Sequence, residues 1–181
     1  ILFENAVRLV EAVIPKMTRA QLKEALLEAQ TSLLHYGLTC VHDFDGPDCF
    51  AALQELEQER KLILRVCKGI PVDFLDNAIA MQVHTGFGSD HLWLGAVKSF
   101  ADGALGPQTA AMLLPYEGST THFGTLQLKA DDVFELGLRA VPNGLSLAIH
   151  AIGDRATHEV LNGFGMLREV ERRMGLPSLN H

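Results

Sequence analysis

The stretch that decides the fold reads Leu145-Ser146-Leu147-Ala148-Ile149-His150. Its side chains alternate, with leucine, leucine and isoleucine on one face and serine, alanine and histidine on the other, as expected of a strand with one apolar face. A second strand, predicted over residues 92–100, carries Lys98 near its C-terminal end. The two strands therefore place a lysine and a histidine at the same end of a predicted sheet, facing one side.

Helical and extended patterns alternate along the rest of the chain. The apolar period and the placement of glycine, proline and capping residues predict helices over residues 2–15, 18–36, 47–60, 73–83, 129–141 and 155–174, and further strands over 38–44 and 62–67. This order indicates parallel strands joined by helices. Open doubly wound sheets and (β/α) barrels both have such an order.

Polar residues inside the strands favour the barrel. A strand covered on both faces normally reads as a continuous apolar run, whereas Lys98 and His150 interrupt two consecutive strands near their C-terminal ends. In a barrel, catalytic groups emerge at those ends. Because a closed barrel takes about 250 residues, we expect an α/β fold that is a partial (β/α)8 TIM-type barrel with a parallel sheet. The first residue is Ile1 rather than Met, so we also expect a piece of a longer protein.

Composition narrows the classes of function. The 181 residues include 15 Lys and Arg against 22 Asp and Glu, and the net charge of −7 argues against a nucleic-acid binder. No apolar run approaches the roughly 20 residues that a membrane span needs. The 3 cysteines lack CxxC spacing, so neither a disulfide framework nor a zinc ribbon is indicated. Reduced thiols in a cytoplasmic protein fit this pattern best.

Lys98 is the residue whose chemistry needs an explanation. A lysine among apolar neighbours must be neutralised, paired or modified, because an isolated buried ammonium is costly. A Schiff base with a carbonyl substrate, a structural ion pair and a carbamate formed with CO2 all meet this requirement. A carbamate can bridge two metal ions, and His150 would then supply an imidazole nitrogen to the same metal. The pattern alone leaves these alternatives open.

Longer segments resemble one enzyme family. Residues 97–106, VKSFADGALG, and residues 148–156, AIHAIGDRA, resemble the "VKxFaDGalG" and "iHaiGDrA" segments of amidohydrolase family 3, the YtcJ-like branch of the metal-dependent amidohydrolases. Residues 2–6 and 37–43 resemble its "LxExA" and "GvTsvhD" segments. The four segments occur in the family's order, and the resemblance covers essentially the whole chain.

The resemblance implies a (β/α)8 barrel that holds one or two divalent metal ions, usually zinc, and hydrolyses a non-peptide C–N bond of an amide or formamide type with a metal-activated water. Lys98, in carbamylated form, would be the metal ligand on strand 4, and His150 the ligand on strand 5. Residues 1–181 would be the central part of the barrel, strands 2–5 with their helices. Strands 1 and 6–8, the remaining ligands and the β-sandwich domain would lie outside it. His181 precedes the expected strand-6 histidine and receives no role.

A long segment without clear period, residues 101–124, is typical of an active-site loop. It holds two candidate substrate contacts, Asp102 and His122, whereas no catalytic residue is assignable in this chain. The alternative for Asp102 is an Asx-type turn with its own backbone, and a loop histidine is commonly inert. Elsewhere, Asp154 is expected to cap a helix, and His42 to lie in the core.

Two rival functions remain open. One is a metal-free barrel lyase or aldolase that uses Lys98 as a Schiff-base nucleophile. The other is a catalytically silent folding module. In either hydrolase or lyase the partner would be a small molecule. Two ligands cannot close a tetrahedral site, so the isolated chain is expected to bind metal weakly or not at all and to be inactive. Its open strand edges favour self-association.

Overall fold

The computed structural model describes residue 10, residues 13–176 and residues 178–181. Most of the helix predicted over residues 2–15 therefore lies outside the described residues. The chain divides into two compact units, one of residues 14–96 and the other of residues 97–181 together with residues 10 and 13. Within the described part, no helix combines the length and the apolar character needed to span a membrane.

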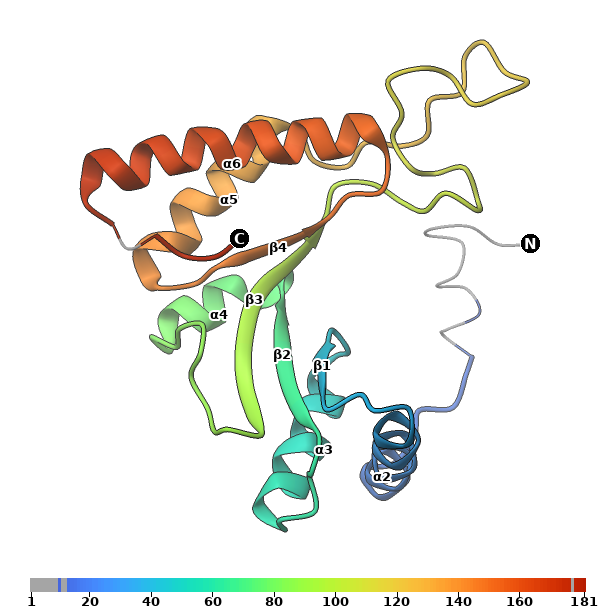
Figure 1. The fold of residues 1–181 in the computed structure, drawn as a ribbon, viewed down its shortest axis with the longest axis vertical. Coiled ribbons are helices and arrows are strands. Elements are labelled where there is room, and N and C mark those ends of the chain that lie inside the picture. Colours follow the sequence, from blue (N-terminus) through green and yellow to red (C-terminus); the bar gives the residue numbers. More distant parts are fainter. Residues whose placement is uncertain (1–9, 11–12, 177) are drawn as a thin grey trace. The chain divides into compact units, whose positions relative to one another are not determined.

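Four strands and five helices alternate along the described chain (Figure 1). The strands are β1 (Cys40–Asp43), β2 (Arg65–Pro71), β3 (Leu92–Phe100) and β4 (Leu147–His150). The helices are α2 (Arg19–His35), α3 (Pro47–Gln58), α4 (Leu75–Ala80), α5 (Ala130–Ala140) and α6 (Asp154–Met174), with short 3-10 turns at Val72–Phe74 and Val141–Asn143. The sheet has the order β1-β2-β3-β4, and β1 pairs parallel with β2 as β3 does with β4. Strand order therefore follows chain order, as in consecutive βα units.

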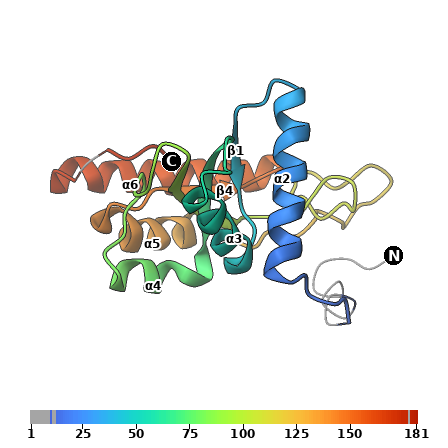
Figure 2. The same ribbon diagram turned by 90° about the horizontal axis from the view of Figure 1, so that it is seen from below.

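In the unit of residues 14–96, α2 begins where the sequence predicts it. Thr18 is the N-cap, and its hydroxyl accepts the Gln21 N–H at 3.3 Å while the Gln21 side chain accepts the Thr18 N–H at 2.9 Å. This reciprocal pair is a capping box. The helix α2 contacts α3 (Figure 2), and the apolar side of α3, including Leu53 and Leu56, packs in one core with Val66 of β2.

The strand predicted over residues 62–67 is displaced along the chain to Arg65–Pro71. The reason is the buried Gln30 of α2. Its side-chain oxygen accepts the N–H groups of Ile63 (2.6 Å) and Leu64 (3.0 Å), and its amide donates to the Lys61 carbonyl (3.1 Å). A helix side chain thus satisfies backbone groups that a strand ladder would otherwise use.

In the unit of residues 97–181, the paired ends of β3 and β4 have one face against helices. Ile149 packs in a core with Val133 of α5 and Val160 of α6. Ser99 is its partner in the ladder and is also buried. Because side chains alternate along a strand, the residues before and after these two point to the opposite face.

The helices α5 and α6 lie side by side in both views (Figures 1 and 2). Glycine permits their close approach. A Cβ built on Gly163 of α6 would lie 2.7 Å from the Ala130 carbonyl oxygen and 2.7 Å from Val133 Cβ. On the other helix, a Cβ on Gly137 would lie 2.4 Å from Leu167 Cδ2. The two helices that cover the sheet face carrying Ile149 are therefore closely packed against each other.

Candidate functional site

Lys98 and His150 project from the same face of neighbouring strands. In the parallel register Lys98 pairs with Ala148, and Phe100 pairs with His150. Registered partners point to one side, and so do alternate residues of a strand. Lys98, Phe100 and His150 therefore share the face opposite to the one covered by α5 and α6, close to the C-terminal ends of their strands.

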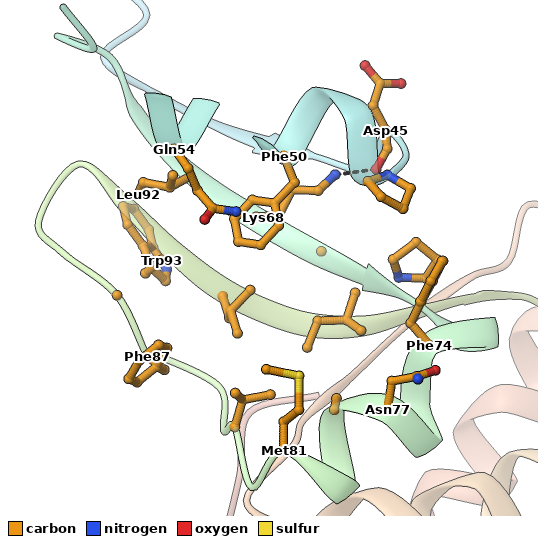
Figure 3. Close-up of a pocket in the computed structure, with 18 of the residues that line it drawn as sticks. Asp45, Phe50, Gln54, Lys68, Phe74, Asn77, Met81, Phe87, Leu92 and Trp93 are labelled. Atoms are coloured by element: carbon orange, nitrogen blue, oxygen red, sulfur yellow. Dashed lines mark hydrogen bonds between the residues drawn. The ribbon is translucent and has the colours of Figure 1, made fainter. Parts of the chain in front are cut away.

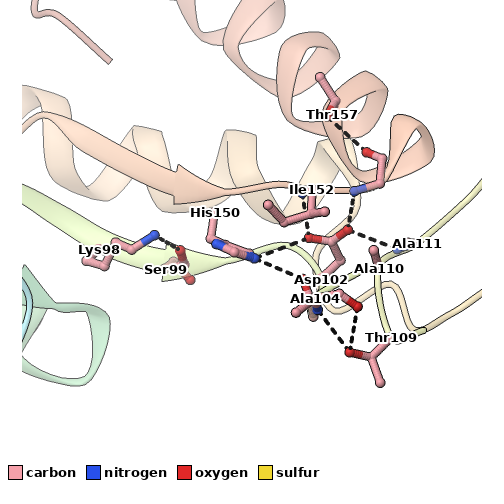
Figure 4. A network of polar contacts seen from close by, with 12 residues as sticks. Lys98, Ser99, Asp102, Ala104, Thr109, Ala110, Ala111, His150, Ile152 and Thr157 are labelled. Atoms are coloured by element: carbon pink, nitrogen blue, oxygen red, sulfur yellow. Dashed lines mark hydrogen bonds and ion pairs between the residues drawn. The ribbon is translucent and has the colours of Figure 1, made fainter. Parts of the chain in front are cut away.

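The imidazole of His150 is held in one orientation (Figure 4). Its Nε2 lies 2.9 Å from the Gly103 carbonyl oxygen. A carbonyl only accepts, so Nε2 carries the hydrogen, and in the neutral ring the lone pair is on Nδ1. The ring also lies 5.3 Å from the Phe100 ring, centroid to centroid, at 45°. The ring nitrogen that remains for a ligand is therefore Nδ1.

Lys98 lies half-buried beside the same aromatic ring. Its Nζ donates to the Ser99 carbonyl at 3.3 Å and lies 4.4 Å from the centroid of the Phe100 ring. Burial lowers the pKa of the Lys98 ammonium below its ordinary value. A lowered pKa increases the fraction of neutral amine, which is the form that attacks a carbonyl carbon or CO2.

Asp102 has a carboxylate that binds backbone N–H groups (Figure 4). Its Oδ2 accepts from Ala111 (2.9 Å) and Gly153 (2.7 Å), and its Oδ1 accepts from Ile152 (3.0 Å). Oδ1 also lies 3.8 Å from Nε2 of His150. These contacts join the end of β3 to the long loop and to the segment after β4.

The surroundings of Asp102 bear on both predictions made for it. The Asx-type turn is not formed, because the Ala104 N–H donates to the Thr109 hydroxyl at 2.9 Å. Asp102 is only 1% exposed. The burial and the backbone hydrogen bonds of Asp102 favour a role in holding the backbone, and its contact with a substrate stays a prediction.

Two other residues with predicted roles lie in the long loop and at the start of α6. The exposed His122 stacks on Tyr116, with ring centroids 5.2 Å apart, and its contact with a substrate stays a prediction. The N-cap of α6 is Gly153, so the prediction that Asp154 caps this helix is wrong by one residue. Asp154 lies in the first turn, and its carboxylate accepts the Leu113 N–H of the long loop at 2.8 Å.

A second group of ionisable residues lies in the unit of residues 14–96. Asp43, Asp45 and Cys49 place one potential ligand atom each within 4.8 Å of one another. However, Nζ of the buried Lys68 donates to the Asp43 carboxylate and to the Asp45 carbonyl. Burial, followed by the negative charge of Asp43, raises the pKa of Cys49 to about 11. The Lys68 ammonium already neutralises the Asp43 carboxylate, and the Cys49 thiol stays protonated. This group therefore forms an ion pair rather than a metal site.

The sequence-based interpretation missed this ion pair. Lys68 and Asp43 are partners in the ladder between β1 and β2. The available signal was an aspartate at the end of one predicted strand and a lysine directly after the next.

The predicted core position of His42 is wrong, because this residue is exposed. It precedes Asp43 on the strand and therefore points to the opposite face.

A groove of 630 Å³ lies in the same unit, between α3, α4 and strands β2 and β3 (Figure 3). Its walls are mainly apolar and include Phe50, Met81 and Trp93. The buried ionisable group in its wall is Lys68, which is already paired with Asp43. The groove is therefore not a candidate for acid–base or metal chemistry.

His181 lies apart from His150. Its Nδ1 accepts the N–H of Leu147, the first residue of β4, at 3.1 Å, whereas His150 is the last residue of that strand. Its Nε2 lies 3.1 Å from the Glu171 carboxylate, and burial lowers the pKa of the His181 imidazole. The His181 ring is therefore hydrogen-bonded to the start of β4, whereas His150 lies at the end of this strand.

Comparison with known proteins agrees with this geometry. The model of the amidohydrolase family matches residues 1–181. A structure of an uncharacterized metal-dependent hydrolase from Pyrococcus furiosus is 32% identical, with a TM-score of 0.79, over 90% of this chain and 34% of that one. This likeness confirms the predicted partial barrel.

Two curated relatives are also similar. Protein LONG AFTER FAR-RED 3 of Arabidopsis thaliana is 26% identical over 90% of this chain and 30% of its own length. YtcJ of Bacillus subtilis (strain 168), an amidohydrolase by name, is 29% identical over 90% of this chain and 31% of its own length. The chain thus spans about a third of the length of these relatives. The family match over the full length of the sequence decides the assignment: the chain belongs to the amidohydrolase family.

Proposed function

We propose that the protein is a metal-dependent amidohydrolase that hydrolyses a non-peptide C–N bond of a small amide or formamide-type molecule. The observation that carries this proposal is the shared face of Lys98 and His150 at the ends of two paired strands. Membership of the amidohydrolase family and the likeness to a metal-dependent hydrolase support it. In a barrel, this end of the strands is the one that bears the active site.

The two side chains fit a divalent metal. His150 offers a nitrogen lone pair at Nδ1, because Gly103 accepts the hydrogen on Nε2. Burial favours the neutral amine of Lys98. We propose that this amine forms an N–C bond to CO2 and releases a proton, which gives a carbamate with two oxygen donors. Nitrogen and oxygen donors of these kinds suit zinc, as one ion or two.

The residues of this chain would then hold and orient the reacting groups. A bound zinc ion supplies a water of lowered pKa and polarises the substrate carbonyl. His150 keeps its ring direction through Gly103, and the Phe100 ring lies against both proposed ligands. We assign no proton-transferring residue within the described part of the chain.

The extent of the similarity supports a proposal about domain organisation. Because the chain spans about a third of its relatives, we propose that residues 1–181 are the central part of the barrel, strands 2–5 with their helices. The outer strands of the described sheet are β1 and β4. Self-association through these edges and a cytoplasmic location stay predictions.

The test is the metal content of the full-length protein, measured by plasma mass spectrometry. We expect one or two zinc equivalents in the wild type and loss of metal and of amide hydrolysis in Lys98→Ala and His150→Ala. Matched controls are Lys61→Ala and His158→Ala, which remove the same side-chain types at exposed positions and should keep the metal. A metal-free wild type would overturn the proposal. Borohydride trapping of a carbonyl substrate on Lys98 would then support the Schiff-base alternative.

A further inference from the structure

The backbone on both sides of His150 is tied to the end of β3, but by different means. The strand ladder ends where the Ala101 N–H donates to the His150 carbonyl at 2.8 Å. Beyond that point the carboxylate of Asp102 accepts the N–H groups of Ile152 and Gly153, two and three residues after His150. The Asp102 side chain thus connects the end of β3 to the segment after His150, where the backbone hydrogen bonds of the ladder have ended.

The ring of His150 is bound by the same short segment of chain. Gly103, next to Asp102, accepts the hydrogen of Nε2, and Phe100 contacts the ring from β3. The Asp102 carboxylate lies 3.8 Å from the same nitrogen. A negative charge near Nε2–H favours the tautomer that leaves the lone pair on Nδ1.

The loop is bound to the same point. Asp102 accepts the Ala111 N–H, and the Ala111 carbonyl accepts N–H groups of Arg155 and Ala156 in the first turn of α6. A Cβ on Gly153 would lie 1.9 Å from that carbonyl oxygen, so the two backbone segments are in direct contact as well as hydrogen-bonded. Any displacement of Asp102 would therefore be transmitted to the residues that follow His150.

We propose that Asp102 is a positioning residue for His150: it holds the backbone after the histidine and, through Gly103, the Nε2–H tautomer of its ring. The proposal rests on the proposed function in that His150 is taken as a metal ligand. The competing explanation is that Asp102 stabilises the loop without affecting the ring. Asp154 provides the comparison, because its carboxylate also binds a loop N–H, that of Leu113, but makes no described contact with His150.

The experiment compares Asp102→Asn with Asp154→Asn in the full-length protein. Asparagine keeps the shape of the side chain, but its NH2 group would face an N–H donor that the carboxylate now satisfies. We expect Asp102→Asn to weaken Zn²⁺ binding, measured by chelator competition, by about 10- to 100-fold. It should also shift the visible absorption bands of the Co²⁺-loaded protein. Asp154→Asn should change neither the Zn²⁺ affinity nor the Co²⁺ bands. Circular dichroism checks that both variants are folded before they are compared.

A second readout needs neither bound metal nor a folded Asp102→Asn variant. The ring ¹⁵N shifts of His150 in the metal-free wild type, assigned with His150→Ala, should report the neutral Nε2–H tautomer. An Nδ1–H or averaged ring would overturn the proposal even if Asp102→Asn did not fold. Unchanged Zn²⁺ affinity and Co²⁺ bands in folded Asp102→Asn would do the same. A wild type that binds no metal would instead overturn the proposed function.

Discussion

Replacing Gly163 by alanine perturbs the closest approach between α5 and α6. The new Cβ would lie 2.7 Å from the Ala130 carbonyl oxygen and 2.7 Å from Val133 Cβ, distances that real Cβ atoms do not adopt. The first neighbour is backbone, and Val133 is fully buried, so neither can move without displacing other atoms. The helices must therefore separate slightly or bend.

The magnitude follows from two opposing effects on the free energy of unfolding. Overpacking a core costs about 1–3 kcal/mol, whereas alanine in a helix interior is about 1 kcal/mol more favourable than glycine. Gly163→Ala should thus range from nearly neutral to about 2 kcal/mol destabilising. At Gly165, two residues along the same helix, an added Cβ would meet no atom within 4 Å. Gly165→Ala should therefore show only the helix-propensity gain.

Differential scanning calorimetry of the two variants isolates the packing effect. For a cooperatively unfolding unit of about 150–250 residues, 1 kcal/mol corresponds to about 2–4 °C in Tm. Gly165→Ala should raise Tm by about that amount, and Gly163→Ala should melt about 2–12 °C below Gly165→Ala. Equal increases in Tm for both variants would refute the reasoning, because they would mean that α5 leaves space for a methyl group at Gly163.

Two further predictions concern buried ionisable groups. Since burial lowers the pKa of His181 below 6.5 in the folded protein, its neutral ring contributes stability that is complete above pH 6.5 and is lost as the pH falls toward the folded-state pKa. The Tm of the wild type should accordingly fall more than that of His181→Gln between about pH 7.5 and about pH 5.5, and parallel profiles would contradict this. Lys68→Ala should lower the free energy of unfolding in urea by about 3–5 kcal/mol, because it leaves the carboxylate of Asp43, only 17% exposed, without its cation. Lys61→Ala, at an exposed position, should change it little, and equal effects of the two substitutions would exclude a special role for the buried pair.

Local patterns in the sequence determined most of the elements. The strand β3 was predicted with the bounds it has, and α2 begins at the predicted cap, Thr18. Both depend on signals a few residues apart, the alternation of a strand and the reach of a capping side chain. The same alternation places Lys98 and His150 on one face, and resemblance to the amidohydrolases supplied their proposed roles.

The tertiary structure alone decided how the site is held together. The carboxylate of Asp102 binds N–H groups 50 and 51 residues away, and Lys68 pairs with Asp43 over 25 residues. The start of β2 depends on Gln30, whose amide binds backbone 31 to 34 residues further on. Such partners leave no periodic trace in a sequence, because any residue that the fold brings within hydrogen-bond distance can supply the donor or acceptor. Sequence periodicity reports which face a side chain occupies, whereas its partners depend on how the chain closes.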